Sequence, residues 1–207
     1  LTSAEVGAVT RDAIGLRVRG VCFPPALLRA ADVPADSPTS LDVVSVANFP
    51  TGDYPLEFVF AQVALALRNG AHHVDVVVPG EKVETGDWKG MERFMAAVRR
   101  HGEESDRTGR FALKVILETA AWKEDRIRGA AAAAIEAGAR WLKTSTGFHP
   151  AGGATPDSVA LLREIAPETV GVKASGGIRT RETALAMLDA GADRIGTSSE
   201  RAILVGR

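Results

Sequence analysis

The sequence has a single cysteine, Cys22, among its 207 residues. One cysteine excludes an intramolecular disulfide and a cysteine-based zinc cluster, and it fits a reducing compartment, so we expect a cytoplasmic protein. No apolar run approaches the roughly 20 residues needed to span a bilayer. Glu5, Arg11 and Asp12 stand where a signal peptide would have its apolar core. We therefore expect neither membrane insertion nor secretion.

The sequence also lacks an excess of charge of one sign, because 25 Lys and Arg stand against 26 Asp and Glu. A net charge of -1 gives no overall field that would recruit nucleic acid or an anionic membrane, so an anionic ligand needs a local site. The four histidines form no pair at metal-ligand spacing, and the adjacent His72 and His73 would face opposite sides of a strand. A zinc-dependent reaction is therefore disfavoured.

Short β-branched runs alternate with Ala-rich amphipathic stretches such as Leu56 to Asn69 and Lys123 to Ala137. This alternation predicts repeated βα units around a parallel sheet, with Gly70, Gly138 and Gly191 capping helices at their C-terminal ends. No linker divides the chain, and we interpret Pro34 to Pro38 as a loop, so residues 1–207 are expected to form one domain. The seven expected strands are Gly20 to Pro24, Leu41 to Phe49, His73 to Val78, Ala112 to Thr119, Trp141 to Thr146, Val170 to Ser175 and Arg194 to Ser198.

Three of these strands carry a lysine: Lys114, Lys143 and Lys173, at intervals of 29 and 30 residues. The interval is one βα unit, so the lysines fall on successive strands, and strand alternation separates them from their aliphatic neighbours and points them into a barrel. A buried lysine is costly unless it is paired. A salt bridge to a neighbouring carboxylate explains Lys114 equally well, whereas Lys143 and Lys173 together indicate chemistry.

The physical reason for two adjacent lysines is control of the pKa. An amine must be neutral to attack a carbonyl, and an unperturbed lysine is neutral in only about one part in 2,500 at pH 7. A second ammonium and partial burial both lower the pKa of the first amine. Asp75 interrupts a run of valines and shares the inward face, where it is a structural partner for a lysine, a proton shuttle, or both.

Two glycine-containing segments predict an anion site. Gly176 and Gly177 precede a helix that opens near Thr180, and the segment from Gly196 to Ser199, which contains Ser198, precedes a short helical stretch. Barrels often bind phosphate at the loops after their last two strands, through backbone amides at helix openings. A Gly-Gly turn alone would fit a plain tight turn equally well.

The segments Lys143-Thr-Ser-Thr-Gly-Phe, Gly171-Val-Lys-Ala-Ser-Gly-Gly-Ile-Arg and Gly196-Thr-Ser-Ser resemble the signature segments of the deoxyribose-phosphate aldolase family. The resemblance implies a (β/α)8 TIM barrel. It also implies reversible cleavage of 2-deoxy-D-ribose 5-phosphate to acetaldehyde and D-glyceraldehyde 3-phosphate, without metal or cofactor.

The resemblance further implies roles for individual residues. Lys143 forms the imine, Lys173 perturbs it and helps to move protons, and Asp75 completes the relay. The expected partners are a sugar phosphate and short aldehydes only, and assembly into a homo-oligomer stays open. Further expected substrate contacts are Thr146, Gly147, Cys22 and Asn48.

The family usually opens with an Asp-x-Thr strand before the helix that Thr2 to Glu5 begin. We therefore expect eight strands, the first of them missing from this chain, in a native protein longer at its N-terminus. The family commonly ends in a tail tyrosine, whereas Tyr54 is the only tyrosine here, so enamine formation is expected to be slowed. Two rivals remain: another phosphosugar lyase or isomerase, and a silent sugar-phosphate-binding barrel.

Overall fold

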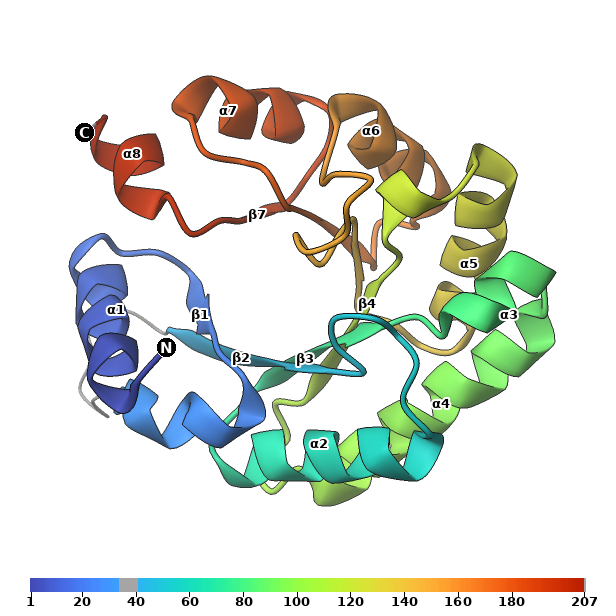
Figure 1. The fold of residues 1–207 in the computed structure, drawn as a ribbon, viewed down its shortest axis with the longest axis horizontal. Helices are drawn as coiled ribbons and strands as arrows, with labels where there is room; N and C mark the ends of the chain where they lie inside the picture. The colour runs from blue at the N-terminus through green and yellow to red at the C-terminus, as the bar shows by residue number, and fades with distance from the viewer. Residues whose placement is uncertain (34–40, 207) are drawn as a thin grey trace.

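A computed structural model describes residues 1–33 and 41–206, and the loop predicted from Pro34 to Pro38 lies outside them. Seven parallel strands pair in their order along the chain, β1 to β7, and helices lie around the sheet (Figure 1). The predicted parallel βα architecture is therefore confirmed. The strands are β1 (Gly20–Cys22), β2 (Asp42–Ala47), β3 (His73–Val77), β4 (Ala112–Ile116), β5 (Trp141–Lys143), β6 (Gly171–Ser175) and β7 (Arg194–Gly196).

All seven strands begin within one residue of the predicted position. β6 also ends at the predicted Ser175, but the other six strands end earlier than predicted. β5 stops at Lys143 and not at Thr146, and β4 stops at Ile116 and not at Thr119. The residues beyond these ends keep a strand-like composition, but they turn away from the sheet to build the site. Glu118, for example, adopts a left-handed backbone conformation with φ 51°.

The helices pack apolar stripes onto the outer face of the sheet. α2 buries Val59, Val63 and Ala66, and α4 buries Met91 and Met95, at the three- and four-residue spacing of a helix face. The helices are α1 (Ser3–Gly15), α2 (Leu56–Arg68), α3 (Gly80–Thr85), α4 (Trp88–Ser105), α5 (Glu124–Glu136), α6 (Pro156–Ile165), α7 (Arg181–Asp189) and α8 (Glu200–Val205), with 3-10 turns η1 (Pro25–Ala31) and η2 (Thr119–Ala121).

Helix termination follows the predicted chemistry. Gly70, Gly138 and Gly191 have φ of 97°, 87° and 103°, the left-handed region in which glycine carries no steric penalty. The predicted helices over Leu56 to Asn69 and Lys123 to Ala137 correspond to α2 and α5. None of the helices in residues 1–33 and 41–206 is both long and apolar enough to cross a membrane.

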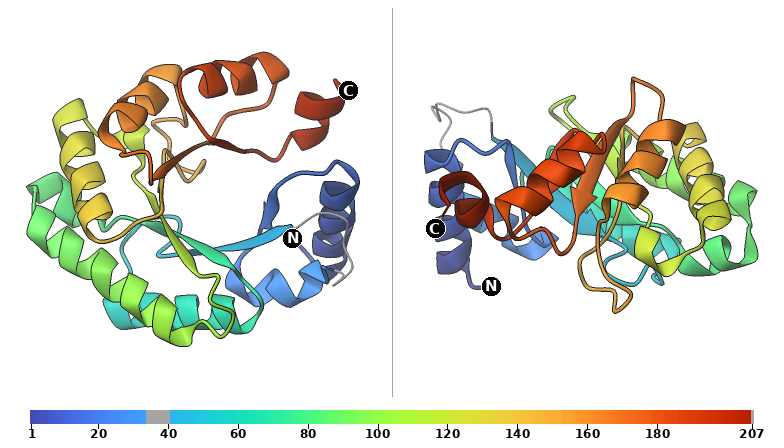
Figure 2. Two further views of the ribbon diagram at one scale, coloured as in Figure 1. Left: turned by 180° about the vertical axis from the view of Figure 1, so that it is seen from behind. Right: turned by 90° about the horizontal axis from the view of Figure 1, so that it is seen from above.

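The sheet curls, but among the described residues no hydrogen-bonded ladder joins β7 to β1 (Figures 1 and 2). Side chains bridge this seam. Asp12 of α1 and Arg201 of α8 form an ion pair, and Arg194 of β7 lies 3.3 Å from the carboxylate of Asp42 on β2. The seven strands expected in this chain are thus all present, and ion pairs between side chains bridge the two ends of the sheet.

Candidate active site

Four inward-facing charged residues meet in the interior of the barrel. The strand register places Asp75 beside Lys114 and Lys143 beside Lys173. Asp75 Oδ2 accepts hydrogen bonds from Lys143 Nζ at 3.0 Å and Lys173 Nζ at 2.9 Å. Lys114 Nζ lies 3.3 Å from Asp75 Oδ1. All four residues are buried, so the prediction that the lysines share one interior is confirmed.

The single carboxylate of Asp75 is therefore within ion-pair distance of all three lysine amines. Burial works to raise the pKa of Asp75, but Lys173, Lys143 and Lys114 outweigh it and hold that pKa well below its usual range. A carboxylate in this setting stays ionised throughout the physiological range. Since the lysines outnumber it, the cluster retains an excess of positive charge.

The same cluster shifts two lysines in opposite directions. Burial lowers the pKa of Lys114 to about 8, and repulsion from Lys173 adds to the effect while Asp75 opposes it. Burial also disfavours charge on Lys173, but the Asp75 carboxylate outweighs burial, so the pKa of Lys173 is raised. The expectation that one ammonium simply depresses the pKa of its neighbour was incomplete, because it left out a carboxylate bonded to both.

The ends of β5 and β6 are tied together just beyond the lysines. Thr144 Oγ1 accepts a hydrogen bond from Ser175 N at 3.0 Å and donates one to Ser175 O at 3.1 Å. Ser175 Oγ donates to Ser145 O at 2.6 Å. These buried bonds tie together the strand ends that carry Lys143 and Lys173.

Glycines allow the two signature loops to approach closely. A Cβ on Gly176 would lie 3.2 Å from the Cα of Gly147 and 3.0 Å from that of Gly153. Gly147 and Gly176 also have φ of 84° and 88°, which L side chains rarely adopt. Both glycines are therefore required by backbone geometry, whether or not they contact substrate.

Thr146, a predicted substrate contact, is held by Glu118. The Glu118 carboxylate is buried and accepts hydrogen bonds from Thr146 Oγ1 at 2.5 Å and Thr146 N at 3.2 Å. Thr146 Oγ1 in turn accepts from Phe148 N at 3.1 Å. Both residues line a cavity of about 490 Å³ at the C-terminal ends of the strands, together with Val77 and Trp122.

The two loops of the predicted anion site lie together. Thr197 Oγ1, in the loop after β7, donates to Ile178 O in the loop after β6 at 2.7 Å and accepts from Ser199 N at 2.9 Å. The predicted helix openings are confirmed at Thr180, which caps α7, and at Ser199, which precedes α8. The remaining members of the predicted anion site in these loops are Gly177, Gly196 and Ser198.

Cys22 and Asn48 occupy different settings. Cys22 ends β1, is exposed, and interacts electrostatically with Asp75 and the three lysines. Asn48 is fully buried: its Nδ2 donates to Val77 O at 2.9 Å and its Oδ1 accepts from Tyr54 N at 2.9 Å. The polar atoms of the Asn48 side chain thus already have partners in the loop after β2.

Sequence reasoning assigned no role to Glu118, Thr144, Ser175 or Thr197, which support the site. Thr144, Ser175 and Thr197 lie within the three segments quoted above, and Glu118 lies in the strand predicted from Ala112 to Thr119. Composition cannot show which side chain bonds to which backbone atom. Across residues 1–33 and 41–206, no group of three or more His, Cys, Asp or Glu side chains is arranged to hold a metal ion.

Residues 24–206 of the chain match the DeoC/LacD family of aldolases. It is 42% identical over 209 residues to a deoxyribose-phosphate aldolase of Mycolicibacterium paratuberculosis and 40% identical over 205 residues to that of Kocuria rhizophila. These alignments cover 99% of this chain and 90% and 89% of the relatives. The deoxyribose phosphate aldolase structure from Aeropyrum pernix superposes with a TM-score of 0.85 at 29% identity, covering 100% of this chain and 84% of that one.

Proposed function

The chain belongs to the DeoC/LacD family of aldolases, and we propose that it is a class I deoxyribose-phosphate aldolase with Lys143 as the Schiff-base lysine. Its reaction is the reversible cleavage of 2-deoxy-D-ribose 5-phosphate to acetaldehyde and D-glyceraldehyde 3-phosphate. The observation that carries the mechanism is the buried contact of Lys143 and Lys173 with one oxygen of Asp75.

The first requirement is a neutral amine. A cluster of three ammonium groups around one carboxylate releases its first proton more readily than an isolated lysine, because the remaining charges repel. The pKa of Lys114 is lowered to about 8, chiefly by burial, and repulsion from Lys173 adds to this. Since all three lysines contact Asp75, a proton can be exchanged through that carboxylate, and the neutral amine can reside on Lys143 when a carbonyl arrives.

The neutral Nζ of Lys143 adds to the aldehyde carbon of the open-chain sugar, and loss of water leaves a protonated imine. The imine accepts the electron pair of the breaking bond between C2 and C3, while the C3 hydroxyl loses its proton and departs as the aldehyde of D-glyceraldehyde 3-phosphate. The resulting enamine takes a proton at C2, and hydrolysis of the new imine releases acetaldehyde and restores Lys143.

Asp75 and Lys173 are assigned to proton transfer. Lys173 has a raised pKa and stays protonated, so it supplies the proton that the hydroxyl of the first adduct needs to leave as water. Asp75 holds both amines by one oxygen, and as a carboxylate that stays ionised it orients the water that relays a proton when substrate separates the groups. Lys114 tunes the charge of the cluster from the far side of Asp75.

The phosphate of the substrate is assigned to the loops after β6 and β7. Gly176 and Gly177 expose backbone amides without side chains in the way, and Ser198 and Ser199 offer further donors. Thr146, Gly147 and Cys22 are assigned to the sugar and aldehyde, whereas Asn48 positions the loop before α2.

The predicted cytoplasmic location, the single domain and a homo-oligomeric assembly stay predictions.

The test is release of D-glyceraldehyde 3-phosphate from 2-deoxy-D-ribose 5-phosphate by wild type, K143M and K123M. Lys123 lies at the exposed start of α5, so K123M is the matched control. We expect K143M to lose essentially all activity and K123M to keep it. Full activity of K143M would overturn the assignment. Ketose formation without cleavage by wild type would identify the rival isomerase, and binding without turnover the silent barrel.

A further inference from the structure

The end of the barrel opposite the lysine cluster has a second cavity, of about 840 Å³. Its wall includes the first residues of several strands: His73 of β3, Ala112 of β4, Trp141 of β5 and Arg194 of β7. These lie at the N-terminal ends of parallel strands, whereas the site described above lies at their C-terminal ends. The cavity volume falls within the range of about 300–1,000 Å³ of small-molecule sites.

The wall of this cavity is strongly basic. It contains four arginines, Arg99, Arg110, Arg140 and Arg194, and one carboxylate, that of Glu103. Arg99 already pairs with Glu103, at 2.5 Å between Nη1 and Oε1. The charges of the other three arginines are therefore not balanced by an acid of the wall.

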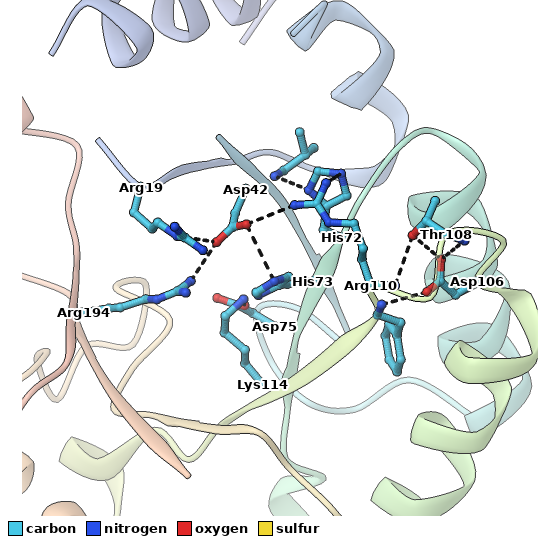
Figure 3. Close-up of polar contacts among 12 residues, drawn as sticks. Arg19, Asp42, His72, His73, Asp75, Asp106, Thr108, Arg110, Lys114 and Arg194 are labelled. Atoms are coloured by element: carbon cyan, nitrogen blue, oxygen red, sulfur yellow. Dashed lines mark hydrogen bonds and ion pairs between the residues drawn. The ribbon is translucent and has the colours of Figure 1, made fainter. Parts of the chain in front are cut away.

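Asp42 is the carboxylate that two of these arginines share. Its oxygens lie 3.5 Å from Arg110 and 3.3 Å from Arg194, and also 3.0 Å from Arg19 (Figure 3). A single negative charge cannot neutralise three guanidinium groups. His73, 4.0 Å from Asp42, has a pKa lowered to about 4 by burial and by Lys114, so it is neutral at pH 7.

Two of the arginines in this wall differ in how firmly they are held. The guanidinium of Arg194 stacks on the Trp141 ring at 4.2 Å, which fixes its plane. Arg140, next to Trp141, is exposed, and no partner for its side chain is found in residues 1–33 and 41–206. A fixed guanidinium and a free one on the same wall suit a ligand with more than one anionic group.

We propose that this cavity binds a compound carrying a diphosphate group, with Arg110, Arg140 and Arg194 as its ligands. Guanidinium groups form bidentate, charge-assisted hydrogen bonds to phosphate oxygens, so a ligand with two phosphates can engage more than one arginine of this wall. Arg110 and Arg140 lie just before β4 and β5, and Arg194 begins β7. Inorganic diphosphate and a nucleoside diphosphate share this chemistry. The site is separate from the substrate phosphate loops, which lie at the other end of the strands.

The test is titration calorimetry of the full chain with inorganic diphosphate and, separately, with adenosine diphosphate. We expect R140Q to weaken binding about tenfold, as the loss of a charge-assisted contact does. R93Q, which removes one charge from the exposed face of α4, should leave affinity unchanged. Equal weakening by both variants, no binding by wild type, or equally tight binding of sulfate would overturn the proposal. Tighter binding of adenosine diphosphate than of diphosphate indicates a nucleotide ligand, and equal binding the diphosphate alone.

Hydrogen exchange locates the site independently of affinity. Diphosphate should protect amides in residues 109–113 and 138–142, on the wall of the basic cavity. Protection confined to residues 175–178 and 196–199 would assign the binding to the substrate phosphate loops and overturn a second site. R140Q removes no hydrogen bond of the folded chain among the described residues, so its fold should be intact, which circular dichroism checks.

Discussion

Lys143 Nζ lies 3.0 Å from Asp75 Oδ2, so the proposed nucleophile rests as one half of a buried ion pair. The contact positions the amine, but a protonated amine cannot attack a carbonyl. Activation therefore depends on the neighbours of the pair. Lys114 and Lys173 compete for the same carboxylate and weaken its hold on any one proton.

Replacement of Asp75 tests this shared role. D75N leaves three buried lysines without a carboxylate, and breaking a buried pair in this way costs roughly 3–5 kcal/mol of unfolding free energy. The double variant D75N/K114M removes one stranded charge together with the carboxylate, so it should recover part of that loss. Urea denaturation measures the unfolding free energy of both variants. A D75N protein as stable as wild type would contradict the central position given to Asp75.

Asp42 is predicted to hold the seam of the sheet closed. D42N removes the charge that Arg19, Arg110 and Arg194 share, so we expect an unfolding free energy lower by about 2–4 kcal/mol. D125N, at an exposed residue 3.9 Å from Arg126, should change it by less than about 1 kcal/mol. Matching denaturation midpoints for the two variants would show that the seam does not depend on Asp42.

His73 gives stability a dependence on pH. Its pKa is lowered from 6.5 to about 4, chiefly by burial. Between those values the unfolded chain binds the proton and the folded chain does not, so the unfolding free energy falls as pH decreases from 6.5 to 4. The contribution is at most about 3 kcal/mol. H73N should flatten this slope, whereas H149N, at an exposed loop histidine, should keep it. Parallel slopes for wild type and H73N would exclude His73 as the cause.

Glu118 is predicted to position the Lys143 segment through Thr146. E118Q replaces one acceptor oxygen with an amide that cannot accept from Thr146, so the loop shifts. We expect kcat/KM to fall roughly tenfold to a hundredfold, mainly through kcat. E84Q removes an exposed carboxylate from the wall of the same cavity and should have little effect. Equal kinetics for the two variants would leave Glu118 without a positioning role.

Much of the fold could be predicted because its signals are local. Strand alternation placed Asp75 and the lysines on the inward face, and the glycines at 70, 138 and 191 marked helix ends. The strand ends could not be predicted. Thr144 and Thr146 are β-branched and favour strands, yet both lie beyond the end of β5. There Thr144 bonds to Ser175 and Thr146 to Glu118, and these bonds join residues far apart in sequence.

Part of the candidate site could also be predicted from the sequence. The spacing of the lysines indicated a shared interior, because one βα unit separates them. That three amines would meet on one carboxylate depends on the register between β3, β4, β5 and β6, which no single segment encodes. The left-handed backbone of Glu118 and the basic cavity around Arg140 likewise arise only when the strand ends assemble.

The proposed mechanism requires a covalent intermediate on one residue. Incubation with acetaldehyde and borohydride, followed by peptide mass mapping, should show a reduced two-carbon adduct on Lys143, which D75N should slow. Labelling of Lys173 or Lys114 in its place would reverse the roles given to the lysines. Absence of any adduct, in protein that turns over 2-deoxy-D-ribose 5-phosphate, would contradict the Schiff-base mechanism altogether.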